Sequence, residues 1–168
     1  GLPPCYDMTN ANWPLNIVPP ASGGYRLPTE AEWERAAAWD TILSKHWIYS
    51  FLSDTNPSGT ANRCNDVNFG TADNPLGLTA YPYTSPVGWF NGTNVNPNGS
   101  VTTVNSPSPV GAYDLSGNVW EWTHDWYLST YYSGGSMTNP TGPATGSYRV
   151  NRGGGWNNNF NNCRLINR

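Results

Sequence analysis

The sequence predicts a loop-rich α+β domain with few short helices and antiparallel strands. The chain holds 18 glycines and 15 prolines among 168 residues, which requires many turns. Aromatic residues make up 14% of it and include nine tryptophans. A packed core is therefore expected, because disordered chains combine few aromatics with high net charge. One segment has a clear helical pattern and two short segments alternate as strands do. The length suits one domain, and we expect residues 1–168 to form it.

The helix is expected over residues 29–40. Thr29 is a good N-cap, and Glu32, three residues later, completes a capping box. Alanines follow, and Trp33 and Ala37 lie on one side of the helix, which predicts its buried face. Residues 43–51 have a mixed pattern, and we expect a second short helical turn there.

Two strands are expected after the long loop region. Residues 119–124 alternate between two faces, and residues 148–152 form a second strand candidate. Three glycines follow the second strand, where the backbone needs freedom for a bend or a close approach. We expect Trp120, Trp122 and Trp126 to serve the core, because buried aromatics dominate packing energetics.

Charge and composition argue against two classes of partner. The net charge is −3 with eight Lys or Arg residues, so the basic stripe that neutralises phosphates is missing and nucleic acid is not expected. No apolar run approaches the ~20 residues of a membrane span.

The cysteines and histidines give no clear metal or redox site. Cys5, Cys64 and Cys163 are an odd number, which leaves one disulfide plus a thiol, or three thiols. No Cys-x-x-Cys pair occurs, so neither a redox dithiol nor a structural zinc site is expected. His46 and His124 are far apart in sequence, and a packing or surface role is expected for both. Cys163 is expected to be a buried, inert thiol.

The last 18 residues, 151–168, are the most informative segment. They hold seven asparagines, against 15 in the preceding 150 residues. Asparagine is a poor nucleophile, acid or base, but its amide both donates and accepts hydrogen bonds. Amides interleaved with aromatic rings favour a recognition surface. The alternative is that these asparagines simply fill turns. The predicted ligand contacts are Trp156, Asn157, Asn158, Asn159, Phe160, Asn161, Asn162, Leu165 and Asn167.

Three segments resemble the formylglycine-generating enzyme family of sulfatase-modifying proteins, whose domain is a variant of the C-type lectin fold. They read GYRLPTEAEWE (24–34), GAYDLSGNVWEW (111–122) and YRVNRGGGW (148–156). The resemblance spans about residues 1–168 and implies a C-type-lectin-like fold of the formylglycine-generating enzyme type. Relatives usually begin with further strands and end with a further strand, so this domain is expected to lack both.

The resemblance implies an oxidase only in part. The family's oxidases would place two reactive cysteines five residues apart just after the Arg-Gly-Gly motif. Here Cys163 falls near the second position, and Asn158 stands where the first should be. Copper is not expected, because soft Cu(I) requires thiolate ligands. The His-x-x-x-His-x-Glu ligand set of the iron-dependent relatives is also missing. Catalytic residues are therefore not expected, and oxidation of a sulfatase cysteine is the alternative.

The tail resembles a second group, the variable proteins of diversity-generating retroelements. The run RGGGWNNNFNNCR (152–164) is similar to their variable region, where adenine-directed mutagenesis rewrites a C-terminal segment on a fixed lectin-like scaffold. An AAC codon for Asn becomes many residue types when its adenines are changed. The resemblance implies a ligand-binding display protein without catalysis, with residues 151–168 as its variable region.

The resemblance also implies a structural calcium site in residues 114–121. Asp114 and Glu121 would supply carboxylates, and Gly117 and Val119 would supply backbone carbonyls. Calcium takes six to eight oxygen ligands of these two kinds. The family often has a side-chain amide at the position of Asp114, and an acid there keeps an oxygen ligand.

The expected function is recognition of a protein or glycan ligand on another surface, by an extracellular or cell-surface protein. A non-variable cell-surface structural or binding relative is the remaining alternative. Arg26 and Arg164 are expected to be structural partners of carboxylates.

Overall fold

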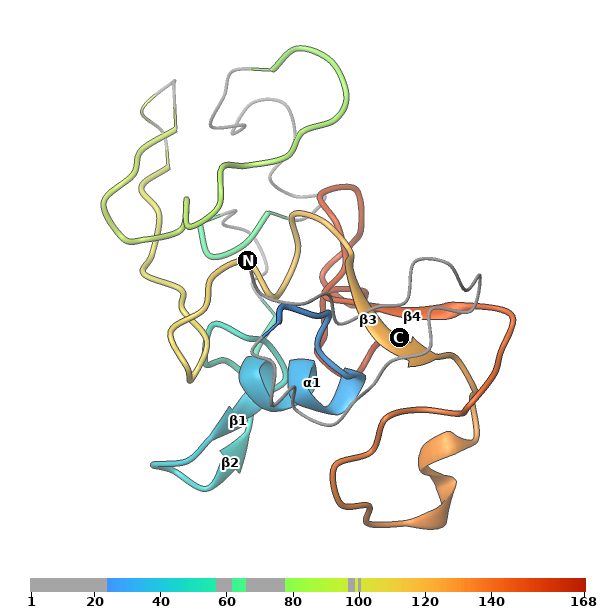
Figure 1. Cartoon of the computed structure of the whole chain (residues 1–168). Helices are drawn as coiled ribbons and strands as arrows, with labels where there is room; N and C mark the ends of the chain where they lie inside the picture. Colours follow the sequence, from blue (N-terminus) through green and yellow to red (C-terminus); the bar gives the residue numbers. More distant parts are fainter. Residues whose placement is uncertain (1–23, 57–61, 66–77, 97–98, 100) are drawn as a thin grey trace. The chain divides into compact units, whose positions relative to one another are not determined.

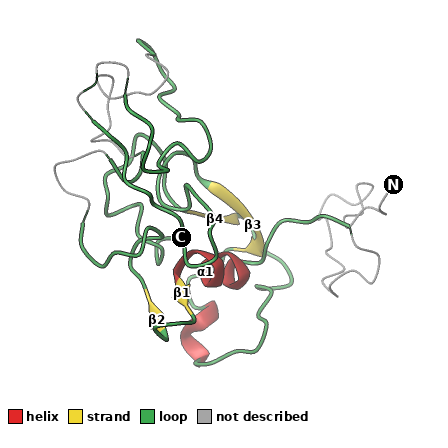
Figure 2. Ribbon diagram, turned by 90° about the vertical axis from the view of Figure 1, so that its left-hand side faces the viewer, coloured by secondary structure: helices red, strands yellow, loops and turns green. Residues whose placement is uncertain are grey.

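The computed structural model describes residues 24–56, 62–65, 78–96, 99 and 101–168. Within these ranges the element order is α1, β1, β2, β3, the 3-10 helix η1 and β4, and loops make up most of the chain (Figures 1 and 2). The fold class is α+β, as predicted. Two compact units are found, one formed by residues 1–33 and 122–150 and the other by residues 34–121 and 151–168. Cys5 and the rest of residues 1–23 lie outside the described residues.

Helix α1 spans Glu30–Ala38 and begins as the sequence predicts. The Thr29 hydroxyl accepts a hydrogen bond from the Glu32 N–H at 3.2 Å, and the Thr29 N–H donates to Glu32 Oε2 at 2.8 Å. This reciprocal pair is the capping box. Arg26 donates to both Glu32 carboxylate oxygens at 2.6 Å and lowers the pKa of Glu32 to about 2. Arg26 therefore has the structural role that was expected.

A small hairpin follows the helix, and the helical turn expected over residues 43–51 is wrong. Strand β1, Trp39–Asp40, pairs antiparallel with β2, Lys45–His46. The Asp40 carboxylate accepts hydrogen bonds from the N–H groups of Ile42 and Leu43. Aspartate favours turns through such contacts with its own following backbone, which here outweighs the helical tendency.

Strand β3 spans Glu121–Trp126 and is hydrogen-bonded to β4, Arg149–Arg152. β3 begins two residues later than the alternation indicated. Between the two strands lies η1, Tyr131–Gly134, which the sequence did not predict. The buried positions of β3 are Thr123 and Asp125.

The tryptophans of this region do not form the core as expected. Trp122 is 58% exposed, while Trp120 and Trp126 are half-buried. The buried positions of β3 instead hold small or hydrogen-bonding side chains; the Thr123 hydroxyl, for example, donates to the Val150 carbonyl. A buried tryptophan does occur in α1, where Trp33 is 4% exposed. Alternation therefore predicted a two-faced strand correctly, but the expectation that aromatics fill the core indicated the wrong face for the interior.

Candidate ligand-binding surface

The C-terminal tail is held at its start by a buried arginine. Arg152, 1% exposed, donates to Glu34 Oε2 at 2.6 Å and to the backbone carbonyl of Leu165. Leu165 is itself fully buried, and its N–H donates to the Ile48 carbonyl at 2.9 Å. One guanidinium thus joins α1 to both ends of the tail. Sequence reasoning missed Arg152, because the carboxylate that pairs with it lies 118 positions away.

The three glycines after Arg152 are buried and allow close packing of the tail on itself. Gly154 has a φ of +76°, and a Cβ on it would lie 2.9 Å from the Cys163 sulfur. Cys163 is fully buried, as predicted for this thiol. Cys64 and Cys163, the two cysteines that the structure describes, are both buried. Glycine is required at position 154 both for its backbone conformation and for the missing side chain.

Four of the predicted contact residues face solvent. Asn157, Asn159, Asn161 and Asn162 are all exposed. They lie in a series of turns, in which the Asn159 carboxamide oxygen accepts a hydrogen bond from the Asn161 N–H at 3.0 Å. Asparagine commonly stabilises turns through local side-chain hydrogen bonds of this kind. The structure therefore supports turn formation at Asn159 and leaves the exposed amides accessible to a partner.

Two other predicted contacts face inward. Asn158 Oδ1 accepts from Trp120 Nε1 at 2.8 Å and from the Gly155 N–H at 2.9 Å, so this amide oxygen supports the turn. Phe160 packs against the buried cluster of Tyr49, Phe51 and Cys64.

Leu165 is 0% exposed, and its assignment as a ligand contact is corrected: the side chain fills the interior. Asn167 is half-buried and donates to the Asn161 carbonyl.

Trp156 does not stand alone, because two tyrosines from a distant loop lie against it. The Tyr81 and Tyr83 rings lie 5.1 and 5.5 Å from the Trp156 ring, and 4.8 Å from each other. Tyr81 is 74% exposed. The sequence gave no signal of this contact, since a spacing of more than 70 residues carries no periodicity.

The predicted calcium loop has a strained backbone and a half-buried acid. Asp114, Gly117 and Asn118 all have positive φ, and a Cβ on Gly117 would lie 2.4 Å from the Asn65 carbonyl oxygen. Asp114 Oδ2 accepts from the Gly88 N–H at 2.7 Å. Burial raises the pKa of the Asp114 carboxyl, while the Gly88 hydrogen bond lowers it. A cation beside this carboxylate would offset the desolvation, so the donor type fits calcium.

No group of three or more His, Cys, Asp or Glu side chains suited to a metal occurs within the described ranges. The predicted calcium loop does not need one, because two of its four proposed ligands are backbone carbonyls. Val119, one of these two, has a side chain that is 47% exposed.

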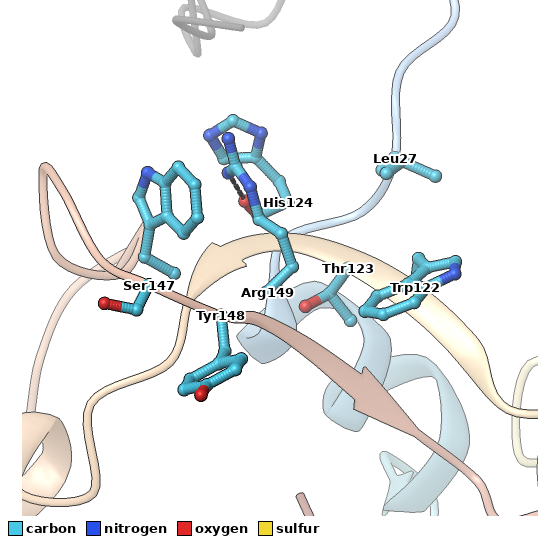
Figure 3. Close-up of a pocket in the computed structure, with 8 residues that line it drawn as sticks. Leu27, Trp122, Thr123, His124, Ser147, Tyr148 and Arg149 are labelled. Atoms are coloured by element: carbon cyan, nitrogen blue, oxygen red, sulfur yellow. Dashed lines mark hydrogen bonds between the residues drawn. The ribbon is translucent and has the colours of Figure 1, made fainter. Parts of the chain in front are cut away.

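A concave, mostly apolar pocket of about 550 Å³ lies beside β3 and β4 (Figure 3). Arg149 is one of its lining residues; its guanidinium carbon lies 3.7 Å from the Trp126 ring centroid, and it donates to the His124 carbonyl. The pKa of His124 is lowered to about 4, mainly because the ring is desolvated and to a smaller extent because the Arg149 and Arg26 charges are near. The pocket is lined by Leu27, Trp122, Thr123, His124, Trp126, Ser147, Tyr148 and Arg149. None of these residues was predicted as a ligand contact.

No helix in the described part of the chain has the length and apolar character needed to cross a membrane.

Comparison with known proteins gives a consistent family. The profile of the sulfatase-modifying factor enzyme 1-like domain matches residues 7–168. The formylglycine-generating enzyme of Thermomonospora curvata is 30% identical over 154 residues, which cover 90% of this chain and 45% of that protein. The serine/threonine-protein kinase pkn1 of Chlamydia pneumoniae is 34% identical over 147 residues, covering 86% of this chain and 18% of the kinase.

Among solved structures, Treponema denticola variable protein 1 is similar, with a TM-score of 0.48 and 32% sequence identity. The match covers 96% of this chain and 46% of that one. The chain thus spans less than half the length of each relative named here. With the family profile covering nearly the whole sequence and the expected sequence segments in order, the chain belongs to the family of the sulfatase-modifying factor enzyme 1-like domain, the family of the formylglycine-generating enzymes.

Proposed function

We propose that this domain is a binding module that displays residues 151–168 to a ligand and performs no catalysis. The observation that carries the proposal is the division of the tail into two sets of positions. Arg152, the three glycines, Cys163 and Leu165 are buried, whereas Asn157, Asn159, Asn161 and Asn162 are exposed. A buried frame fixes the backbone, and exposed side chains can then change with little effect on stability, usually about 0.5 kcal/mol or less.

This division suits a segment that is diversified by a retroelement, because the exposed positions hold the residue whose codon is most easily rewritten. The DNA around the gene tests this part of the proposal. A nearby near-identical copy of the tail-coding segment, differing mainly at adenines, together with a reverse transcriptase gene, is the expected finding. Identical tails across isolates, with neither feature, would instead favour a non-variable structural or binding relative.

The ligand is a protein or glycan on another surface, and the domain acts outside the cytoplasm at a cell surface. Exchange of the four exposed asparagines for other polar residues tests the site directly. The exchange is expected to change which ligand is bound and to leave the thermal midpoint within a few degrees of the parent. A ligand retained with unchanged affinity after the exchange would refute the site.

Family membership favours one alternative, a formylglycine-generating oxidase that acts on a sulfatase cysteine. Asn158 argues against it, because it occupies the position of the first expected cysteine. Its amide oxygen accepts hydrogen bonds from Trp120 and Gly155. An oxidase would bind copper and consume oxygen with loss of the thiol of a sulfatase peptide. Incubation of the domain with Cu(I), oxygen and such a peptide, followed by mass spectrometry, distinguishes the two functions.

We also propose that the calcium loop holds a structural Ca²⁺ through Asp114, Glu121 and the carbonyls of Gly117 and Val119. The support is the half-buried Asp114 carboxylate and the tight turn that Gly117 permits. The ion would stabilise the loop and take no part in chemistry. Its binding is testable by calorimetric titration with CaCl₂, with MgCl₂ as the control.

A further inference from the structure

Tyr81, Tyr83 and Trp156 form a ring cluster between two segments of the chain. Trp156 belongs to the displayed tail, and the two tyrosines belong to a loop outside the tail. Its ring centroids lie 4.8–5.5 Å apart, within the range of favourable aromatic pairs. The Tyr83 and Trp156 rings are almost perpendicular at 80°, whereas Tyr81 and Trp156 are inclined by 32°. Tyr81 remains 74% exposed, so most of this ring faces solvent.

Asn118 fixes the two parts of the ring cluster to each other. Its carbonyl accepts from the Trp156 N–H at 2.9 Å, and its side-chain oxygen accepts from the Ser85 N–H at 2.9 Å. Its amide nitrogen donates to the Ser85 carbonyl at 3.2 Å. A second asparagine, Asn65, donates to the Tyr83 carbonyl at 2.8 Å and to Asn118 Oδ1 at 3.3 Å.

Both asparagines are 5% exposed or less. The rings therefore rest on a buried amide network that holds their backbones before any ligand arrives. Preorganisation of this kind reduces the entropy that binding must offset.

The two segments that carry the rings contain no ionic side chains. Residues 78–96 and 153–163 include no Asp, Glu, Lys, Arg or His. About a quarter of the residues of an ordinary protein are charged. A charged group of a protein partner would lose water against the rings and gain no counter-charge from these two segments, which is unfavourable.

A neutral sugar avoids that penalty. A pyranose has an apolar C–H face that can pack on a ring, and a rim of hydroxyls that can exchange hydrogen bonds with amides. The exposed Asn157 directly follows Trp156 and offers such an amide.

We propose that Tyr81, Tyr83 and Trp156 form an aromatic anchor for a neutral saccharide, and that the exposed asparagines of the tail select among such saccharides. The inference rests on the proposed function, to which it adds the ligand class and two residues outside the tail.

A glycan array that carries neutral oligosaccharides beside sialylated, sulfated and uronic-acid oligosaccharides tests the ligand class. Binding to at least one neutral oligosaccharide, with little change between 50 and 500 mM NaCl, is the expected result. Binding restricted to the acidic oligosaccharides, or to none of the array, would overturn the ligand class.

The neutral oligosaccharide that binds best is then titrated against three variants. Tyr81→Ala is expected to weaken binding about tenfold or more, and Tyr81→Phe to retain most of it. Tyr25→Ala is the matched control, because Tyr25 is 91% exposed and lies outside the ring cluster. Thermal midpoints within a few degrees of the parent establish that each variant is folded.

The outcomes separate the two proposals. If exchange of the tail asparagines changes ligand choice while Tyr81→Ala does not affect affinity, the anchor is refuted and the displayed tail stands. If neither change affects binding, both are refuted. A protein ligand whose binding depends on Tyr81 would refute the saccharide and keep the tail as a binding site.

Discussion

The amide of Asn158 is expected to support the fold rather than to contact a ligand, although it lies among asparagines that face solvent. Replacement by alanine removes one oxygen that serves two donors, Trp120 Nε1 at 2.8 Å and the Gly155 N–H at 2.9 Å. A buried donor left without a partner costs about 1–3 kcal/mol. Gly155 is buried and is expected to incur most of that cost, whereas half-buried Trp120 can be partly rehydrated.

We therefore expect Asn158→Ala to lower the free energy of unfolding by about 2–4 kcal/mol. For a chain of this size, that corresponds to a fall of roughly 5–15 °C in the thermal midpoint. Asn157→Ala is the matched control, because Asn157 is exposed and its replacement is expected to change stability by about 0.5 kcal/mol or less. Asn158→Asp keeps an acceptor oxygen and is expected to fall between the two.

Urea unfolding followed by far-UV circular dichroism measures all three variants against the parent. The dependence of unfolding free energy on urea should stay the same, so that midpoint differences report stability. If Asn158→Ala and Asn157→Ala differ by less than about 0.5 kcal/mol, the two hydrogen bonds do not have the assigned role. Asn158 would then not belong with the positions that support the fold of the tail.

Three further predictions address the frame, the calcium loop and the strand pocket. Arg152→Met should lower the free energy of unfolding by about 2–3 kcal/mol. This loss is smaller than that expected for breaking a fully buried ion pair, because Glu34 can rehydrate. Arg35→Met, at an exposed position, is the control in the same urea assay. CaCl₂ should raise the thermal midpoint of the parent but not of Asp114→Ala. Because burial raises the pKa of Asp114, stability without calcium should fall as pH rises through that pKa, and calcium should reverse this trend. An unchanged midpoint in excess CaCl₂ would argue against the ion. The pKa of His124 is lowered from 6.5 to about 4, so between these pH values His124 is protonated in the unfolded chain but neutral in the folded one. Stability should therefore fall as the pH is lowered from 6.5 toward 4. After allowance for partial exposure the loss is about 1–2 kcal/mol, and His124→Gln should flatten the profile in that window.

Local chemistry made the beginning of α1 predictable, and distance in sequence explains much of what was missed. The capping box between Thr29 and Glu32 depends on residues three apart, so its pattern is visible in the sequence. Arg152 and Glu34 meet across 118 positions, and Tyr81 meets Trp156 across more than 70. Such contacts depend on the complete fold and leave no periodic signal.

The tail shows the same contrast within one segment. Composition correctly indicated a polar surface, since Asn157, Asn159, Asn161 and Asn162 are exposed, but Phe160 packs inward. Composition could not distinguish these residues from Asn158, which has the same side chain and bonds inward. Leu165 was misassigned because an isolated leucine among polar neighbours carries no indication of the face on which it lies. The polar character of this surface could thus be inferred from the sequence, but only the structure shows which residues face solvent.

The bond from Arg152 to the Leu165 carbonyl has a consequence for quality control in the cell. Proteolysis or premature termination just before residue 165 would take away one acceptor of a guanidinium that is 1% exposed, together with a fully buried side chain. Clipped molecules would then fold poorly and be degraded rather than reach their destination. An intact tail would in this way be a condition for survival of the molecule, so that the folded population carries complete tails.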